Sequence, residues 1–367
     1  MHSDLLLVIV VVAAAAFDFT NGFHDTANVV ASSISTRALA PRTAVALASV
    51  LNFVGAFISL KVAATVATGI IDPGQVTETI AFAGLIGAIA WNLMTWAYGL
   101  PSSSSHALIG GVVGAMLAAV GGSGVKAGGL LSKVVIPAVI APVAAFAVAG
   151  LGIVLIYRLF GLRRPGGVTR GFRLGQIVSN SALALAHGTN DAQKTMGVIT
   201  LALVAHGSLS PHHVSVPAWV VVLSATAISL GTYAGGWRII RTVGSRIIKM
   251  DSAQAFSAQA SGAIVILVSS HLGYPLSSTH VISGGVMGAG AAKRLSAVRW
   301  GVAGTIALAW VITLPTAGLF GAAAYELANA FGAGALGPLV IILIAVGGPI
   351  SMALATRRRR LTEAASA

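Results

Sequence analysis

Long apolar stretches separated by short polar ones run through almost the whole chain. Most are near the ~20 residues that a helix needs to cross a bilayer, and no long polar segment interrupts them. They lie at Leu5–Phe17, Ala44–Ile71, Ile80–Leu100, Val134–Ile156, Val214–Ala234, Trp300–Ala324 and Leu336–Leu354. The pattern predicts one all-α membrane domain. No basic residues precede the first stretch as they would in a secretory leader, so we expect a mature helix there.

Two polar motifs each occur twice in this apolar background. Pro101–Ala115 and Pro275–Ala289 match at nine of fifteen positions, and each follows a second motif, NGFHDTAN at 21–28 and HGTNDAQK at 187–194. Fused repeats of this kind are typical of transporters whose substrate site lies where the repeats meet. We expect repeats at 1–161 and 174–332, a basic linker at 162–173, and an extra C-terminal helix with a basic tail at 333–367.

Composition agrees with a multi-pass membrane protein. Of 367 residues, 56% are hydrophobic and 8% are charged, against roughly 25% charged in soluble domains. The mean hydropathy is +0.90. The chain has no Cys, which excludes disulfides and thiolate metal sites. The net charge of +13 comes from Arg and Lys between the apolar stretches, so it indicates membrane orientation rather than nucleic acid binding.

The basic residues also predict the orientation. With the N-terminus outside, 18 of the 22 fall on one side, which we take as the cytoplasmic side of the plasma membrane, together with the linker and the C-terminus. They are Arg37, Arg42, Arg158, Arg163, Arg164, Arg170, Arg173, Arg238, Arg241, Arg246, Lys249, Lys293, Arg294, Arg299 and Arg357–Arg360. This sidedness requires an odd number of crossings per repeat, which inverts the second repeat. The predicted fold is an all-α polytopic protein of two inverted repeats, with about 10–12 membrane segments and re-entrant or broken helices at the glycine-rich motifs.

Two carboxylates recur at equivalent places inside apolar segments. A charge near the bilayer centre costs roughly 2.5–3.5 kcal/mol on insertion scales, so it needs a functional or pairing role. One aspartate could merely cap a half-helix, but Asp25 returns as Asp191, which favours a functional pair. Asp25, Asp191 and Asn190 are the candidate cation-coupling residues. Asp18 has no acidic counterpart, and packing and capping roles both stay open for it.

A Ser/Thr cluster follows a proline in each repeat. Capping needs one hydroxyl, whereas each cluster offers at least three. Several donors at helix N-termini suit a tetrahedral oxyanion. The aspartates would repel this anion unless a proton or another cation neutralised them, and that requirement would couple the two substrates. The candidate anion ligands are Asn28, Ser103, Ser104, Ser105, Lys194, Ser277, Ser278 and Thr279.

Four histidines accompany the motifs. A lone His on an apolar face is usually a packing residue, but His titrates near neutral pH and could relay protons. The candidates are His24, His106, His187 and His280. Asn28 and Lys194 each follow an aspartate by three residues and so share its helical face. Lys194 can therefore neutralise Asp191 or contact the anion.

Patterns typical of enzymes are weak in this sequence. Gly121–Gly124 matches the GxSG of intramembrane serine proteases, but it is unduplicated and predicted to lie in a loop, and no HExxH, Walker A or GxGxxG pattern has a suitable context. Two equivalent clusters argue against an intramembrane Ser/His enzyme, because catalysis needs one asymmetric nucleophile. Sulfate is a closer alternative substrate, since it differs from phosphate mainly in lacking a hydrogen bond to donate to the aspartates. We expect no enzyme activity, resident metal or cofactor.

The motifs resemble the PiT family of inorganic phosphate transporters. The resemblance rests on NGFHDTAN, AHGTNDAQKTMG at 186–197, GTYAGGWRIIRTVG at 231–244 and the paired PSSSSH and PLSSTH, and it covers nearly the whole chain. It implies a secondary transporter with two re-entrant hairpins that hold phosphate near the midplane. By this resemblance the phosphate and cation shell comprises Asp25, Asn28, Ser104, Ser105, Asp191, Ser278 and Thr279.

Three features differ from the sodium-coupled eukaryotic members of that family. Asn52 stands where those members have a glutamate, Lys194 stands where they have an asparagine, and the central linker is short. The chain is more similar to bacterial low-affinity members, which implies a symporter of phosphate, or of a neutral divalent metal–phosphate complex. This similarity favours the proton as the driving ion, with sodium as the alternative. The expected partners are phosphate and the lipid bilayer, without nucleic acid, and a homodimer is compatible with the sequence.

Overall fold

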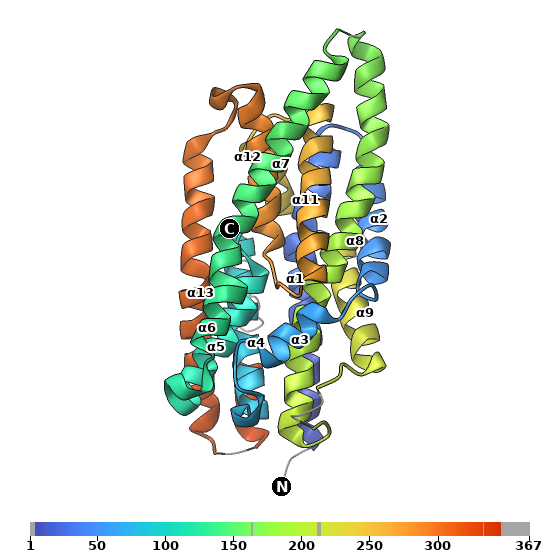
Figure 1. Ribbon diagram of the computed structural model, residues 1–367. Helices are drawn as coiled ribbons and strands as arrows, with labels where there is room; N and C mark the ends of the chain where they lie inside the picture. Colours follow the sequence, from blue (N-terminus) through green and yellow to red (C-terminus); the bar gives the residue numbers. More distant parts are fainter. Residues whose placement is uncertain (1–3, 163, 211–213, 333, 346–367) are drawn as a thin grey trace, which may run out of the picture.

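The computed structural model describes residues 4–162, 164–210, 214–332 and 334–345, and these residues are helical almost throughout (Figure 1). The first half contains α1 Asp4–Ser35, α2 Pro41–Gly55, α3 Lys61–Thr68, η1 Pro73–Gln75, α4 Glu78–Tyr98, α5 Ser104–Val120, η2 Gly121–Gly124, α6 Ala127–Leu130, η3 Leu131–Val135 and α7 Ile136–Phe160. The second half contains α8 Pro165–His206, α9 Ala218–Ala234, α10 Trp237–Arg241, η4 Thr242–Arg246, α11 Ser252–His271, α12 Ser278–Lys293, η5 Leu295–Ala297 and α13 Trp300–Asn329. A last helix, Leu336–Ala345, lies within the predicted C-terminal helix, whose remainder falls outside the described residues together with the basic tail.

The two repeats are inverted, because α1 and α8, which carry the NGFHDTAN and HGTNDAQK motifs, run antiparallel. Ser33 near the end of α1 donates a 2.9 Å hydrogen bond to Asn180 near the start of α8. At the other end of the pair, Asp4 at the start of α1 lies 3.2 Å from His206 at the end of α8. The predicted inversion of the repeats is therefore confirmed.

The Ser/Thr clusters sit at the N-termini of α5 and α12, and a sharp turn of the chain precedes each of these two helices. Gly99 ends α4 in the left-handed conformation, with φ of 65°, and the chain turns back through an extended segment before α5 begins. In the second repeat, a loop with Gly273 at φ 78° separates α11 from α12. The starts of α5 and α12 meet in the middle of the molecule, and the two helices then run toward opposite ends (Figure 1).

Each of these interrupted helices packs against a helix of the other repeat through glycine. A Cβ at Gly114 of α5 would lie 1.9 Å from the Gly318 carbonyl oxygen of α13, and one at Gly288 of α12 would lie 2.1 Å from that of Phe146 in α7. Such close approach requires glycine at these two positions. These two glycines of the glycine-rich motifs thus bring each helix into close contact with the other repeat.

Six of the described helices are long and apolar enough to cross a membrane, or up to seven if the bent pair Ala218–Ala234 and Trp237–Arg246 counts as one span. The pair bends by 59°. Our count of about 10–12 segments also includes shorter or more polar elements such as α2, α8 and α12. The all-helical, multi-span class with a broken span is confirmed.

The basic linker is largely helical. Within the predicted linker at 162–173, α8 begins at Pro165 and continues without a break into the HGTNDAQK motif at 187–194. Proline suits the first turn of a helix, because its missing N–H would lack a partner there in any case. The connection between the repeats is therefore mostly helix (Figure 1).

Candidate functional site

The two duplicated aspartates face the tips of α5 and α12 in the interior. Asp25 and Asp191 are 1% and 0% exposed. Ser104 donates to Asp25 over 3.1 Å, and Ser105 is 3.3 Å from Asp191. The Ser278 hydroxyl lies 3.2 Å from Asp25 and 3.0 Å from Asp191, so it bridges both carboxylates. Each carboxylate therefore contacts hydroxyls of both repeats.

Lys194 supplies the positive charge of the centre. Its ammonium, 1% exposed, forms an ion pair with Asp191 one helical turn away and donates to the Ser105 hydroxyl at 2.5 Å and to the Leu276 carbonyl oxygen at 2.6 Å. A buried charge without a partner is strongly destabilising, so this pairing is necessary in a closed interior. The ion pair supports the neutralisation of Asp191 by Lys194, and contact of Lys194 with an anion stays a prediction.

Asn28 occupies the place equivalent to Lys194 in the first repeat. Its amide donates to Thr279 over 2.9 Å and lies 3.4 Å from the Ser278 hydroxyl. The two equivalent positions thus hold opposite tips: Asn28 binds the start of α12, and Lys194 binds the start of α5.

Two of the four candidate histidines adjoin the carboxylates. His24 Nδ1 lies 2.8 Å from Asp25, and its Nε2 lies 3.1 Å from the Thr95 hydroxyl. His187 Nε2 lies 2.8 Å from Asp191, and its Nδ1 lies 3.3 Å from the Asn52 side-chain oxygen. Each imidazole thus contacts a carboxylate through one nitrogen and a polar side chain through the other, and the proton-relay role of both stays a prediction.

The other two histidines lie elsewhere. The rings of His106 and His280 contact each other edge to face, with centroids 4.7 Å apart, and His280 stacks on Trp310 at 4.1 Å. Both line a mostly apolar cavity of about 710 Å³ that Pro142 and Pro315 also border. Their surroundings are those of packing residues, the alternative that the sequence left open.

Three further candidates serve the local structure. Ser103 and Ser277 are the N-caps of α5 and α12, where they accept hydrogen bonds from the backbone N–H of His106 and His280. The Asn190 amide donates to the Ser270 hydroxyl and the Tyr274 carbonyl oxygen, so it fixes the loop between α11 and α12. The hydroxyls that contact the carboxylates belong to the first or second residue of each helix: Ser104 and Ser105 in α5, and Ser278 in α12.

The centre has donors for an anion and oxygen ligands for a cation. The first backbone N–H groups of α5 and α12 lack partners within their own helices, and both helices direct the positive end of their dipoles here. Ligand atoms of Asp25, His187 and Asp191 lie within 4.8 Å of one another, a spacing that suits a small cation. An anion and a cation that bind here together would offset each other's charge.

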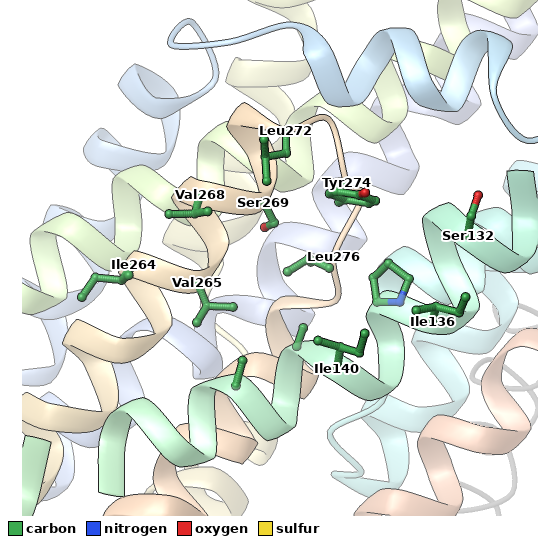
Figure 2. Close-up of a pocket in the computed structure, with 13 residues that line it drawn as sticks. Ser132, Ile136, Ile140, Ile264, Val265, Val268, Ser269, Leu272, Tyr274 and Leu276 are labelled. Atoms are coloured by element: carbon green, nitrogen blue, oxygen red, sulfur yellow. The ribbon is translucent and has the colours of Figure 1, made fainter. Parts of the chain in front are cut away.

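The polar centre is closed, because its side chains are buried. A separate apolar cavity lies beside it (Figure 2). That cavity, of about 420 Å³, lies between α7, α11 and the loop before α12. The Leu276 side chain lines it, while the Leu276 carbonyl accepts from Lys194. Its lining of Ile, Val and Leu side chains is unsuited to a hydrophilic anion.

Sequence reasoning missed three contributors to the site. Leu276 acts through its backbone oxygen, which no side-chain pattern reveals. Thr95, near the end of α4, lies within hydrogen-bonding distance of His24. Its place shortly before the first Ser/Thr cluster is the only signal in the sequence that could have indicated this contact. Gln193 accepts from the N–H groups of Val62 and Ala63 and so caps α3 from a distance.

Inverted repeats that enclose charged and hydroxyl groups are typical of membrane transporters. The Phosphate transporter family model (PHO4) matches the chain twice, at residues 21–170 and 161–321, so the chain belongs to this family and is not an enzyme. The two matches meet inside the predicted linker. The resemblance drawn from the motifs is confirmed.

Relatives and a solved structure agree with this assignment. A "Probable low-affinity inorganic phosphate transporter" of Mycobacterium tuberculosis is 55% identical over 89% of this chain and 78% of its own length. A protein of the same description from Bacillus subtilis is 43% identical over 89% and 98%. The solved structure of "The sodium-dependent phosphate transporter" superposes with a TM-score of 0.82 at 25% identity, covering 89% of this chain and 99% of the other.

Proposed function

We propose that this protein carries inorganic phosphate across the plasma membrane together with a cation, with the proton as the driving ion. The observation that supports this proposal is the closed centre in which Asp25 and Asp191 contact hydroxyls from both repeats. Phosphate would take the place of those carboxylate contacts, with donors from Ser104, Ser105, Ser278, Thr279, Asn28 and Lys194. Protonation of the aspartates would remove their repulsion toward the anion.

The proton is favoured over sodium by the charge already present. Lys194 pairs with Asp191, so this carboxylate needs no resident metal cation to be neutral, and Asp25 adjoins the titratable His24. A neutral divalent metal–phosphate complex is a compatible cargo, because it would bring its own charge balance. In the proposed orientation, the helical linker and the C-terminus face the cytoplasm.

Substrate binding to purified protein tests the proposal. Radiolabelled phosphate should bind in a saturable way, and unlabelled phosphate should displace it at lower concentrations than sulfate does, because only phosphate can donate to the aspartates. The preference should shrink as pH rises from 6 to 8, because phosphate loses one of its two remaining protons in this range and then has one fewer to donate, while sulfate stays a dianion throughout. Equal displacement by sulfate, with uptake of labelled sulfate into vesicles, would assign the protein to another oxyanion.

A further inference from the structure

A seam of uncharged polar side chains fills the interface of α1, α8 and α11 on one side of the site. Ser33 donates to Asn180 over 2.9 Å, and the Gln259 amide nitrogen lies 2.6 Å from the Ser33 hydroxyl and 3.3 Å from the Asn180 oxygen. The three are 0%, 0% and 1% exposed. Farther along, Thr36 donates to Gln176 over 2.7 Å. We call Ser33, Thr36, Gln176, Asn180 and Gln259 the polar seam.

The seam leads from the site to the end of the molecule with many basic residues. Ser33 lies eight residues beyond Asp25 along α1, which corresponds to about 12 Å of helix. Arg37 follows the end of α1, and Arg164, Arg170 and Arg173 surround the start of α8. The seam thus occupies the space between the buried centre and the end that we expect to face the cytoplasm.

The positions equivalent to the seam toward the other end carry apolar side chains. The register of the repeats, which pairs Asp25 with Asp191 and Ser104 with Ser278, places Ile199, Ala14 and Leu85 where the seam has Ser33, Asn180 and Gln259. All three are 0% exposed and belong to one apolar core. The buried polar side chains on that side include Asp18 and Thr195, which hydrogen-bond to each other between α1 and α8 away from these three positions. The scaffold can therefore pack with apolar side chains at the places that the seam occupies.

From this difference we infer that the polar seam is the gate through which phosphate passes between the site and the basic end, an inference that rests on the proposed function. A seal of hydroxyls and amides can exchange its internal hydrogen bonds for bonds to water or phosphate at small net cost. Exposing an apolar seal to water is unfavourable, and the cost in free energy grows in proportion to the area exposed. The seam has neither a carboxylate to repel the anion nor a cation to retain it. Asn180 Nδ2 has no partner within the described structure and is a donor that passing phosphate could use.

Sided labelling tests the gate in a chain that has no native Cys. Ser33→Cys, reconstituted in vesicles, should react with a membrane-impermeant thiol reagent added from the basic end during phosphate exchange. The reaction should slow when saturating phosphate is present on the opposite side only. Ile199→Cys, at the equivalent place in the apolar seal, is the control and should not react from the basic end. Failure of Ser33→Cys to react from that side during exchange, in protein that still binds phosphate, would overturn the gate.

A second test replaces a residue of the polar seam with the apolar residue found at the equivalent position of the other repeat. Gln259→Leu introduces the residue of the mirror position, and we expect turnover to fall about tenfold through the loss of wettable contacts while phosphate affinity changes less than twofold. Ser257→Ala is the control, because Ser257 lies on the same helix but donates to Ala149 outside the seam. Turnover at the wild-type rate, or a parallel loss of affinity, would show that Gln259 is not part of a gate. Absence of phosphate binding by the wild type would instead contradict the proposed function.

Discussion

At the scale of single residues, the hydroxyls at the tips of α5 and α12 connect the two carboxylates. Ser104 and Ser278 both donate to Asp25, and Ser278 also reaches Asp191. Such a hydroxyl can donate to a carboxylate in the empty site and to phosphate in the loaded site. Its removal therefore leaves a buried oxygen without a hydrogen bond in either state.

We expect Ser104→Ala and Ser278→Ala each to raise the KM for phosphate, by an amount equivalent to about 1–3 kcal/mol of lost binding. Initial rates of phosphate uptake by reconstituted vesicles would measure the change. Ser123→Ala, in the exposed turn η2, is the control and should behave as the wild type. Unchanged KM in both tip variants would remove the hydroxyls from the phosphate site.

Lys194 offers a sharper test of how the charges balance. Lys194→Asn removes the ammonium beside Asp191, so the carboxylate would then need an exchangeable cation. We expect phosphate uptake by this variant to become stimulated by sodium at constant pH, whereas wild-type uptake should be independent of sodium. Lys293→Asn, which breaks an exposed ion pair with Asp251, controls for loss of a lysine and should have little effect. Sodium-independent uptake by Lys194→Asn at the wild-type rate would contradict this role.

At the scale of elements, glycine contacts between the repeats hold the interrupted helices. A Cβ at Gly114 has no room against the Gly318 carbonyl, while one at Gly301 of α13 would meet no other atom within 4 Å. The contacts position α5 on a helix of the other repeat, so the α5 tip depends on both repeats for its place.

Gly114→Ala should therefore lower the melting temperature of the detergent-solubilised protein, with a destabilisation of about 1–3 kcal/mol from overpacking. Gly301→Ala should leave it unchanged or raise it slightly, since alanine is the better helix former. The two variants differ from the wild type by the same methyl group, so thermal unfolding isolates the effect of the contact. Equal melting temperatures would mean that the helices can move apart at no cost.

Several elements could be predicted from the sequence for physical reasons. The repeated Ser/Thr clusters after proline predict where helices start, and the glycine-rich motifs predict interrupted helices. The positions of the basic residues predict an inverted second repeat. The helical linker could not be predicted, because Pro165, Gly166 and Gly167 are typical of a loop and their helix depends on the rest of α8. The N-cap roles of Ser103 and Ser277 and the carbonyl of Leu276 depend on backbone positions, which the order of side chains leaves open.

At the scale of the whole molecule, α8 connects both ends, with basic residues at its start and the His206 pair with Glu78 at its end. Its two exposed ends report the orientation of the entire fold. Thr169 lies near the start of α8 and Ser208 lies just beyond its end, so Thr169→Cys and Ser208→Cys place a thiol at each end.

We expect an impermeant maleimide to label Ser208→Cys in intact cells and to label Thr169→Cys only in inside-out vesicles. The expectation follows from the bias of basic residues toward the cytoplasm. Permeabilised cells, in which both variants should react, provide the control. Labelling of Thr169→Cys in intact cells would reverse the proposed orientation.

The central claim is that Asp25 and Asp191 couple phosphate movement to a cation gradient. The most direct measurement is phosphate accumulation in proteoliposomes under an imposed proton or sodium gradient, with wild type, Asp25→Asn and Asp191→Asn. We expect the wild type to accumulate phosphate under a proton gradient in sodium-free medium and to lose it when an uncoupler is added. Each Asn variant should fail to accumulate, because an amide cannot exchange a proton. Accumulation that follows the sodium gradient and ignores the uncoupler would contradict proton coupling, and full accumulation by either variant would contradict the role of the aspartates.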